Sequence, residues 1–586
     1  MLETVSVEDL ANALLPGLPE PCWPGLADAT VKERAREYAR QSGLWEQIAA
    51  KLKATEPIPV LRYSDYRDYQ RTGSRERYER LVSQRVEQTH LAALALWLDH
   101  PAANVDYLQD LLWAWCESAW NYPAHELSHI ELVSSSIALL LAEYAWLFRE
   151  RIELPVQQRV NKELDERMLS VVLDWRKSDW WNTTGNNWNS VCNGNLIQIA
   201  MYQVSEARQL AALIHPLVRR MDYAIQYFPQ DGGCPEGAGY WEYGFGHFLD
   251  AALVLQHRTG GKINLADDEH IRRICRFPLA VQLQGSQRAN FSDSSDGWVS
   301  AQMAMKINRL CGMSEIFSMV APSPLGLLQM QDIRTLTLYQ GQRPDAMMDG
   351  ADYLLPQLGY AKVHAGPQVV LAAISGRNDV SHNHNDIGSF ILMAGGKVLL
   401  TDPGAPVYSA KTFGPKRYEM FVCRSRGHSV PLINGCEQSA GSQYWGTIEA
   451  QGLNVDGNKM IRMDLSHAYP DPTLERLVRE FHVQSTGEVH LVDAYRFNQV
   501  PRSLEEAFIT FESVVVAMDG ESVLIGEDSA ALTLACTSPG RFAVEEISAS
   551  AHEGRGTRPL RRITFTPQTL TVEMELMFSL SPRVTS

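Results

Sequence analysis

Residues Ser381–Phe390 combine three ionisable side chains at a spacing that could build a reactive surface. His382, His384 and Asp386 stand at every second position, directly before the apolar run Phe390–Met393. Residues two apart in an extended strand point to the same face, so we expect both imidazoles and the carboxylate to share one surface. Burying three such groups together is costly unless they bind a metal or take part in a reaction. The segment therefore predicts a functional site.

A second polar constellation lies earlier, in Trp180–Asn193, which is rich in indoles and amides. Four asparagines fall within the eight residues 186–193. Side-chain amides compete with helical backbone hydrogen bonds, so this cluster predicts a helix N-terminus or a loop that faces a polar ligand. Tryptophan faces suit sugar rings, and amides suit hydroxyls and carboxylates. The alternative is a capped helix start with tryptophans in the core.

The third constellation is Asp231–Tyr243, whose glycines and proline disfavour a continuous helix before about Gly239. Tyr240 and Tyr243 then stand at a loop-to-helix junction and, being three residues apart, share one face of the helix. The alternative is a structural pair of tyrosines at a helix start.

The elements that must position these residues change in kind near residues 340–355. Apolar residues before that point recur at helical spacing, in Leu91–Leu98, Leu108–Trp120, Ser134–Glu150, Leu164–Trp175 and Phe248–His257. Short β-rich runs follow it: Val369–Ile374, Phe390–Met393, Val398–Leu400, Val489–Val492, Phe508–Phe511, Ser522–Ile525 and Leu570–Leu580. The sequence therefore predicts packed helices first and a large antiparallel sandwich second.

Bulk properties narrow the class of protein. A chain of 586 residues exceeds what one hydrophobic core usually supports. A formal net charge of −16 argues against nucleic acid and anionic membranes as partners, and an anionic substrate would need a local cluster of positive groups. The nine cysteines include no C-x-x-C pair, which argues against a disulfide framework and a zinc finger. Without a signal-peptide pattern or a long apolar run, we expect a cytoplasmic enzyme.

Together the three constellations resemble the heparinase II/III-like polysaccharide lyases, a group that includes the oligoalginate lyases. The resemblance is carried by Gly185-Asn-Asn-Trp-Asn, Asp231-Gly-Gly-x-Pro-Glu-Gly-x-x-Tyr-x-x-Tyr, His382-x-His-x-Asp-x-x-Ser-Phe with Asp402-Pro-Gly, Arg426–Gly435 and Asn290–Asp293. It implies an N-terminal (α/α) toroid of helical hairpins over residues 1–345 and a C-terminal antiparallel β-sandwich over 346–586. It also implies β-elimination at a uronic acid, which leaves a 4,5-unsaturated sugar.

The implied reaction removes the proton on C5 of the uronate and expels the glycosidic oxygen on C4. The ionised carboxylate makes that proton weakly acidic, so hydrogen bonds must neutralise the carboxylate. The resemblance gives this task to Asn187 and His382. Tyr240 is the implied acid and, depending on substrate stereochemistry, also the base, with His382 as the rival base. A tyrosine with an ordinary pKa of about 10 needs nearby positive charge to act as a base.

The resemblance further implies a structural zinc ion held by His384, Asp402 and His428, a ligand set that suits zinc. If Gly395-Gly396 form a hairpin loop, a straight strand would hold His384 and Asp402 roughly 16 Å apart. The chain must therefore bend near Asn385–Gly388. Asp386 is left to brace its neighbours by hydrogen bonds.

Five further residues are predicted to bind substrate: Trp188, Tyr243, Glu236, His125 and Arg417. Trp188 stands where several relatives of the group carry a histidine, which removes one candidate ligand for the carboxylate. The Arg417 guanidinium would suit a bidentate carboxylate contact, although His125 and Arg417 fit solvated surface equally well.

The expected partner is an oligo- or polysaccharide that contains uronic acid, with a homodimer as one option for assembly. A uronyl C5-epimerase-type enzyme and a non-catalytic glycan-binding protein are the alternative functions. The combination of Asn187, Tyr240 and His382 favours turnover, because binding alone does not require it.

Overall fold

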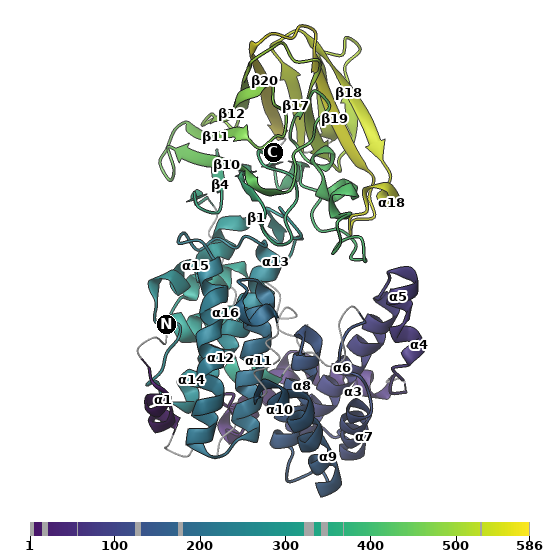
Figure 1. The fold of residues 1–586 in the computed structure, drawn as a ribbon, viewed down its shortest axis with the longest axis vertical. Helices are drawn as coiled ribbons and strands as arrows, with labels where there is room; N and C mark the ends of the chain where they lie inside the picture. Colours follow the sequence, from purple (N-terminus) through teal and green to yellow (C-terminus); the bar gives the residue numbers. More distant parts are fainter. Residues whose placement is uncertain are drawn as a thin grey trace. The chain divides into compact units, whose positions relative to one another are not determined.

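The computed structural model describes residues 5–14, 22–54, 57–123, 130–173, 180–321, 333–341, 350–366, 368–527 and 530–584. Its contacts divide the chain into two compact units (Figure 1). The helical unit comprises Met1–Tyr227, Trp241–Arg272 and Val299–Asp345, and the β unit comprises Phe228–Tyr240, Arg273–Trp298 and Ala346–Ser586. Two segments from the helical part of the sequence therefore group with the strands.

The described part of the helical unit consists mainly of helices. In chain order they are α1 (Val7–Leu14), α2 (Ala29–Gln41), α3 (Leu44–Lys53), α4 (Tyr63–Tyr66), α5 (Asp68–Thr72), α6 (Glu76–Trp97), α7 (Val105–Cys116), α8 (Leu132–Leu147), α9 (Leu154–Leu164), α10 (Ser170–Leu173), α11 (Asn187–Gln203), α12 (Ala207–Tyr227), α14 (Gly246–Arg258), α16 (Ala301–Cys311) and α17 (Ile333–Leu338). Helix α15 (Glu269–Val281) spans the boundary between the two units. Of the five segments predicted as helical, four fall on α6, α7, α8 and α14. The fifth, Leu164–Trp175, runs from the last residue of α9 through the π-helix Asp165–Leu169 and α10, and its residues 174–175 lie outside the described part of the chain.

The core of this unit is built on α8 and α11, which are buried on nearly every side; α8 is largely apolar, whereas α11 also buries four asparagines. Helix α8 begins with a capping box, in which the Glu131 side chain and Ser134 satisfy each other's backbone N–H groups. Asn195 of α11 donates to Ser135 Oγ of α8 at 3.0 Å. A Cβ on Gly194 would lie 2.7 Å from the His247 carbonyl oxygen of α14, so glycine permits this close helix packing.

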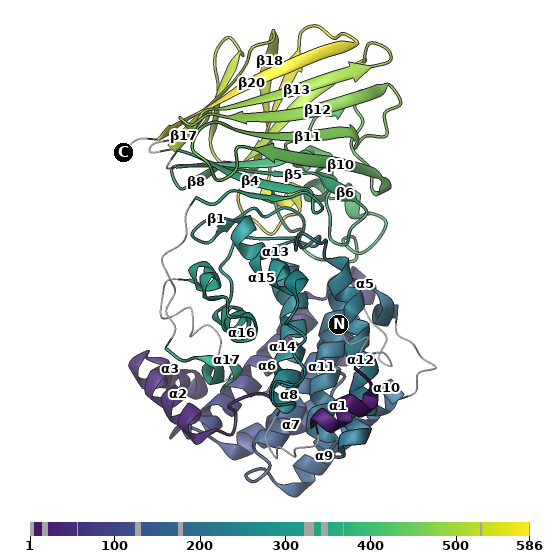
Figure 2. The ribbon, with the colours of Figure 1, turned by 90° about the vertical axis from the view of Figure 1, so that its left-hand side faces the viewer.

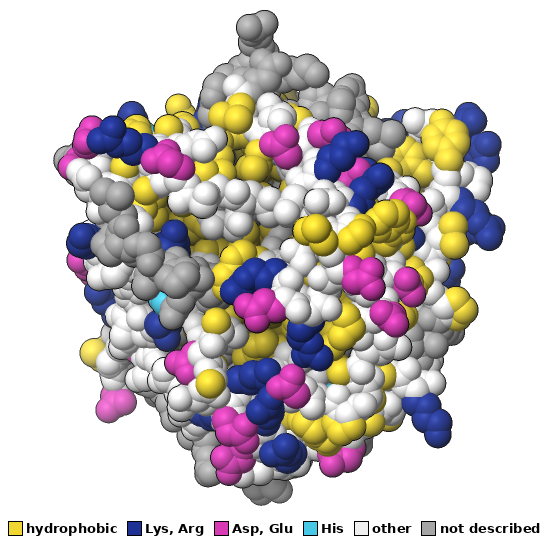
Figure 3. Space-filling view, turned by 90° about the horizontal axis from the view of Figure 1, so that it is seen from below, with side chains coloured by type: hydrophobic (Ala, Val, Ile, Leu, Met, Phe, Trp, Pro, Cys, Tyr) yellow, Lys and Arg dark blue, Asp and Glu magenta, His cyan; other side chains and the backbone are white. Residues whose placement is uncertain are grey.

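Figure 3 shows one face of the molecule, on which described Lys, Arg, Asp and Glu side chains are interspersed and hydrophobic side chains lie between them. Within the described part of that face, no broad area of one sign is offered to a polyanion. Separately, no helix among the described residues is long and apolar enough to cross a bilayer.

The β unit contains antiparallel sheets. The largest has nine strands in the order β15-β16-β17-β20-β13-β12-β11-β10-β6, and Figure 2 shows β10 to β13 side by side. The others have the orders β18-β19-β14-β9, β3-β4-β5-β7-β8 and β1-β2. The strands are β1 (Gln282–Gln284), β2 (Gln287–Arg288), β3 (Tyr353–Leu355), β4 (Tyr360–Ala365), β5 (Val369–Ile374), β6 (Gly376–Asn378), β7 (Phe390–Ala394), β8 (Lys397–Leu400), β9 (Leu432–Ile433), β10 (Gly441–Gln451), β11 (Lys459–His467), β12 (Leu474–Val483), β13 (Val489–Phe497), β14 (Leu504–Thr510), β15 (Val514–Val516), β16 (Ser522–Glu527), β17 (Ala530–Cys536), β18 (Gly540–Ile547), β19 (Leu560–Pro567) and β20 (Glu573–Val584).

One hydrophobic core joins the nine-, four- and five-stranded sheets, with Phe390 of β7 contacting Phe481 of β12 and Phe508 of β14. The seven runs predicted as strands fall on β5, β7, β8, β13, β14, β16 and β20. The predicted hairpin loop Gly395-Gly396 joins β7 to β8, and both glycines have positive φ, as a two-residue loop requires.

The expectation that His382, His384 and Asp386 share one face of a strand is wrong. Residues 379–389 form a loop between β6 and β7, and the strand begins only at Phe390. The predicted bend near Asn385–Gly388 is present, with Gly388 at φ 98°. The loop is fixed by contacts to other segments, and its two histidines meet different partners, Glu236 for His382 and Asp293 for His384.

Candidate active site and metal site

His382 is held in an unusual conformation at the start of the site. Its φ of 61° lies in the left-handed region, which non-glycine residues seldom adopt and which is common at functional sites. Its carbonyl oxygen accepts the Asp293 N–H at 3.2 Å. Its Nδ1 lies 2.8 Å from Oε2 of buried Glu236, and because a carboxylate only accepts, Nδ1 carries the proton. Nε2 of His382 is then left as a proton acceptor.

Tyr240 stacks on this imidazole. Its ring lies parallel to the His382 ring, with centroids 3.9 Å apart and planes within 10°. The two hydroxyl oxygens of Tyr240 and Tyr408 lie 2.6 Å apart. Burial raises the pKa of Tyr240 to about 12, despite the hydrogen bond with Tyr408, which lowers it. The Tyr240 phenol therefore stays protonated and can serve as a proton donor.

Arg555 brings positive charge to the tyrosine pair, as a tyrosine that acts as a base was expected to need, whereas Arg417 lies against Asp293. The Arg555 guanidinium carbon lies 4.8 Å from the centre of the Tyr408 ring. Arg417 donates to Asp293 at 2.6 Å and to the Asn383 carbonyl oxygen, and only 11% of its side chain is exposed. Arg417, predicted to bind substrate, thus contacts the loop and Asp293.

A possible metal site lies on the other side of His384. Donor atoms of His384, Asp386 and His428 lie within 4.8 Å of one another, and all three residues are buried. His384 Nε2–H donates to Asp293, and among the described residues neither His384 Nδ1 nor Asp386 Oδ2 has a hydrogen-bond partner. Buried ligand atoms without a hydrogen-bond partner, such as these two, fit a divalent cation that prefers imidazole nitrogen and carboxylate oxygen.

The carboxylate in this group is that of Asp386, whereas the predicted ligand was Asp402. Asp402 Oδ2 lies 2.9 Å from His428 Nδ1, and Asp402 Oδ1 accepts the Gly404 N–H. Asp402 therefore borders the group, whereas Asp386 is inside it. Asp386 was expected to brace its neighbours by hydrogen bonds, but its Oδ2 makes no hydrogen bond within the described chain. Burial and the nearby Asp402 raise the pKa of this carboxyl. His384 Nδ1 and Asp386 Oδ2 fit a metal ion, which adds Asp386 to the predicted ligands, whereas the two ring nitrogens of His428 lie against Asp402 Oδ2 and the Val422 carbonyl oxygen, so His428 would have to give up one of these contacts to bind it.

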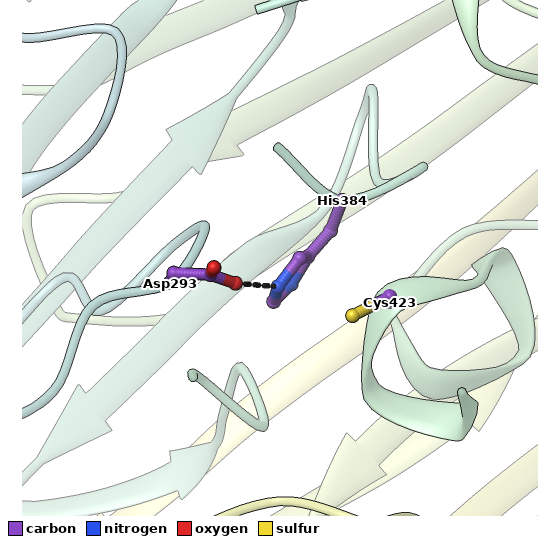
Figure 4. A group of neighbouring side chains, drawn as sticks. All are labelled: Asp293, His384 and Cys423. Carbon is purple, nitrogen blue, oxygen red and sulfur yellow. Dashed lines mark hydrogen bonds and ion pairs between the residues drawn. The ribbon is translucent and has the colours of Figure 1, made fainter. Parts of the chain in front are cut away.

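Asp293, His384 and Cys423 form a second group of potential ligands (Figure 4). Two features argue against a metal there. The Arg417 guanidinium already neutralises Asp293 and, with His384 and against the effect of burial, holds the pKa of that carboxyl well below its usual range. Burial raises the pKa of Cys423 to about 12, which disfavours the thiolate that a metal requires. The group is better described as the hydrogen-bonded surroundings of His384.

Three predicted site residues belong to the helical unit. Asn187 is buried at the first position of α11, which begins after the N-cap Asn186 and so confirms the predicted helix start. The Trp188 ring lies 5.0 Å from that of Trp180, and Tyr243 meets His247 edge to face. Their roles toward a substrate stay predictions. His125 lies outside the described residues.

Three residues of the site carry weak or no signals in the sequence. Asp293 stood only in the minor motif Asn290–Asp293, Tyr408 follows Asp402-Pro-Gly without a distinctive pattern, and Arg555 lies in an unremarkable C-terminal stretch. Tyr240 and Tyr408 are 168 residues apart, so only the fold brings them together.

Comparisons with known proteins agree with this architecture. The sequence model of the family described as "Heparinase II/III-like, C-terminal" matches residues 347–579. No curated protein matches the chain. Heparinase III superposes with a TM-score of 0.66 at 14% identity, covering 96% of this chain and 92% of heparinase III.

Two further solved structures are similar. A mutant of the heparan sulfate lyase HepC from Pedobacter heparinus has a TM-score of 0.58 at 12% identity, covering 86% of this chain and 76% of its own. The chondroitin AC lyase of Streptomyces coelicolor A3, in complex with chondroitin sulphate, has a TM-score of 0.52 at 10% identity, covering 99% and 83%. At these identities the likeness establishes the fold, and the predicted (α/α) toroid followed by a β-sandwich is confirmed.

Proposed function

Because residues 347–579 form a heparinase II/III-like C-terminal domain on a chain with the heparinase III fold, we propose that this protein is a lyase that cleaves uronic-acid-containing oligo- or polysaccharides by β-elimination. The observation that carries the proposal is the contact between Tyr240 and His382, with Glu236 bound to His382. It holds a proton donor and a proton acceptor side by side.

His382 is assigned as the base. Because Nδ1–H is bound by the Glu236 carboxylate, Nε2 can accept the C5 proton, and the carboxylate stabilises the imidazolium that forms. Glu236 is buried and contacts His382, which supports an orienting role in place of the predicted contact with substrate. The carboxylate of the uronate must be neutralised as charge develops at C5, for which Asn187 stays the predicted donor.

Tyr240 is assigned as the acid. Its neutral phenol gives its proton to the glycosidic oxygen as the C4–O4 bond breaks, and the electron pair left by the C5 proton forms the C4–C5 double bond. The raised pKa of Tyr240, about 12, supports this assignment over that of a base, because the phenol is protonated at neutral pH.

His384, Asp386 and His428 would hold the metal ion that the family resemblance implies, with Asp402 beside them. Bound there, zinc would supply a structural link between the loop 379–389 and the segment around His428. The residues assigned to proton transfer are outside this group.

The proposal is tested by incubating the protein with alginate, heparan, chondroitin and hyaluronan oligosaccharides and following the ultraviolet absorbance of the new double bond. We expect absorbance on at least one uronide. A Tyr240→Phe variant should lower kcat by about 100- to 10,000-fold, the usual contribution of general acid catalysis. Tyr339→Phe, which keeps the ring contact with Tyr38, is the control and should keep the rate.

Each other outcome points to a different function. Binding of a uronide without absorbance would leave a glycan-binding protein. Exchange of the C5 proton with deuterated solvent without absorbance would indicate an epimerase-type reaction.

A further inference from the structure

Asp293 contacts four residues of the site, although it has been assigned neither to proton transfer nor to metal binding. It is buried, and its Oδ1 accepts from His384 Nε2 at 3.0 Å and from Arg417 Nη2 at 2.6 Å. Its Oδ2 accepts from the Tyr408 hydroxyl at 3.1 Å. Its backbone N–H donates to the His382 carbonyl oxygen. One residue thus contacts the histidine loop at two points and the tyrosine pair at a third.

These contacts fix the direction of the hydrogen bonds that reach Tyr240. A carboxylate paired with a guanidinium can only accept, so the Tyr408 hydroxyl must donate to Asp293. The Tyr408 oxygen is then left to accept the Tyr240 hydroxyl proton at 2.6 Å. The orientation of the Tyr240 hydroxyl therefore depends on a carboxylate that Tyr240 does not touch.

We propose that Asp293 is a positioning residue for the reaction: through Tyr408 it orients the Tyr240 hydroxyl, and through its other contacts it holds the turn that carries His382. The inference rests on the proposed lyase function. When Tyr240 has given its proton to the leaving oxygen, the Tyr408 hydroxyl can turn from Asp293 toward the new phenolate. That rotation stabilises the negative charge without a further proton.

The contacts around the turn support the second part of this role. Arg417, which binds Asp293, also donates to the Asn383 carbonyl oxygen, between the two histidines. The Asn290 amide of the same segment donates to the Asp402 carbonyl oxygen at 3.2 Å. The segment 290–293 therefore contacts both the histidine loop and the chain after β8. These contacts hold the strained backbone conformation of His382.

Asp293→Asn tests the proposal, because an amide keeps the volume but can donate to Tyr408 and so reverse the hydrogen bonds. We expect kcat to fall by about 10- to 100-fold, the usual effect of losing a supporting contact, with KM nearly unchanged. Tyr408→Phe should give a similar loss, and the double variant should lose no more than the worse single variant, because both act through Tyr240. Tyr469→Phe, which removes a buried hydroxyl group that donates to the Pro431 carbonyl oxygen, should keep kcat.

Additional measurements separate positioning from damage to the fold or the metal site. Metal content and melting temperature should match the wild-type protein in Tyr408→Phe. A crystal structure of Asp293→Asn should show the two tyrosine hydroxyls moved apart or the His382 turn displaced. An unchanged kcat in either single variant, or additive losses in the double variant, would overturn the proposal.

If the wild-type protein cleaves no uronide, the lyase function fails on its own. The crystal structure of Asp293→Asn still decides the positioning role, because an unmoved tyrosine pair and turn would refute it. Should Asp293→Asn fail to fold, Tyr408→Phe decides, since a normal kcat there would contradict the relay.

Discussion

Asn187 begins helix α11, where the helix dipole favours negative charge. An Asn187→Asp substitution should therefore preserve the fold while it places a carboxylate at the position predicted to bind the uronate carboxylate. We expect kcat/KM to fall by about 100-fold or more, because like charges brought together cost several kcal/mol. Steady-state rates and melting curves check this.

Asn187→Ala is the matched variant, since it removes the amide without adding charge. It should lose less activity than Asn187→Asp. Equal losses in the two variants would show that no carboxylate approaches this position.

Single residues were predictable where they stood in dense motifs. Tyr240, His382 and His384 were identified by their types and spacing together with the family resemblance, and the structure places the first two in contact. The partners that complete them were not predictable, because a contact such as Asp293 with His384, across 91 residues, leaves no local pattern.

At the scale of elements, strands were easier to predict than the loop that carries the motif. Alternation and turn residues located β5, β7 and β8, whereas residues 379–389 read as the start of a strand. Tertiary contacts override that pattern: Arg479, paired with Asp493, donates to the carbonyl oxygens of Gly388 at 2.8 Å and Ser429 at 2.7 Å. A buried charge from β12 thereby ties this loop to the segment after His428.

Helix α8 permits a prediction about pH, because its N-cap is a buried carboxyl. Burial raises the pKa of Glu131 to about 7, although the Val133 and Ser134 N–H groups lower it. The folded state thus binds this proton more tightly than the unfolded chain does. That contribution to stability is full below the unfolded pKa of about 4.3 and is lost as pH rises through about 7.

Glu131→Gln keeps a cap oxygen but cannot ionise. Its free energy of unfolding relative to wild type should rise between pH 4.5 and pH 8 by on the order of 3 kcal/mol. Denaturant unfolding at both pH values measures this. Glu150→Gln, whose side chain is 86% exposed, should show no such change. A constant difference for Glu131→Gln across this range would contradict the raised pKa.

At the scale of the whole molecule, the division into units follows contacts more than sequence order. Phe228–Tyr240 and Arg273–Trp298, both from the first part of the chain, group with the β unit and carry Glu236, Tyr240 and Asp293. The proposed proton donor, the proposed base and every proposed metal ligand therefore belong to one unit. The change in composition near residues 340–355 predicts the two kinds of architecture, but it carries no signal that these two segments group with the strands.

This grouping predicts which unit loses stability when the metal is removed. His384, Asp386 and His428 all belong to the β unit, and binding to the folded state alone stabilises what it binds. Chelation should therefore speed amide hydrogen exchange in peptides covering 381–388, 425–430 and 290–294, while peptides of α7, α8 and α9 keep their rates. Asp386→Asn should reproduce the pattern and lower the metal content. Unchanged exchange after chelation would refute the metal site, and a uniform rise in both units would show that its stabilisation is not confined to the β unit.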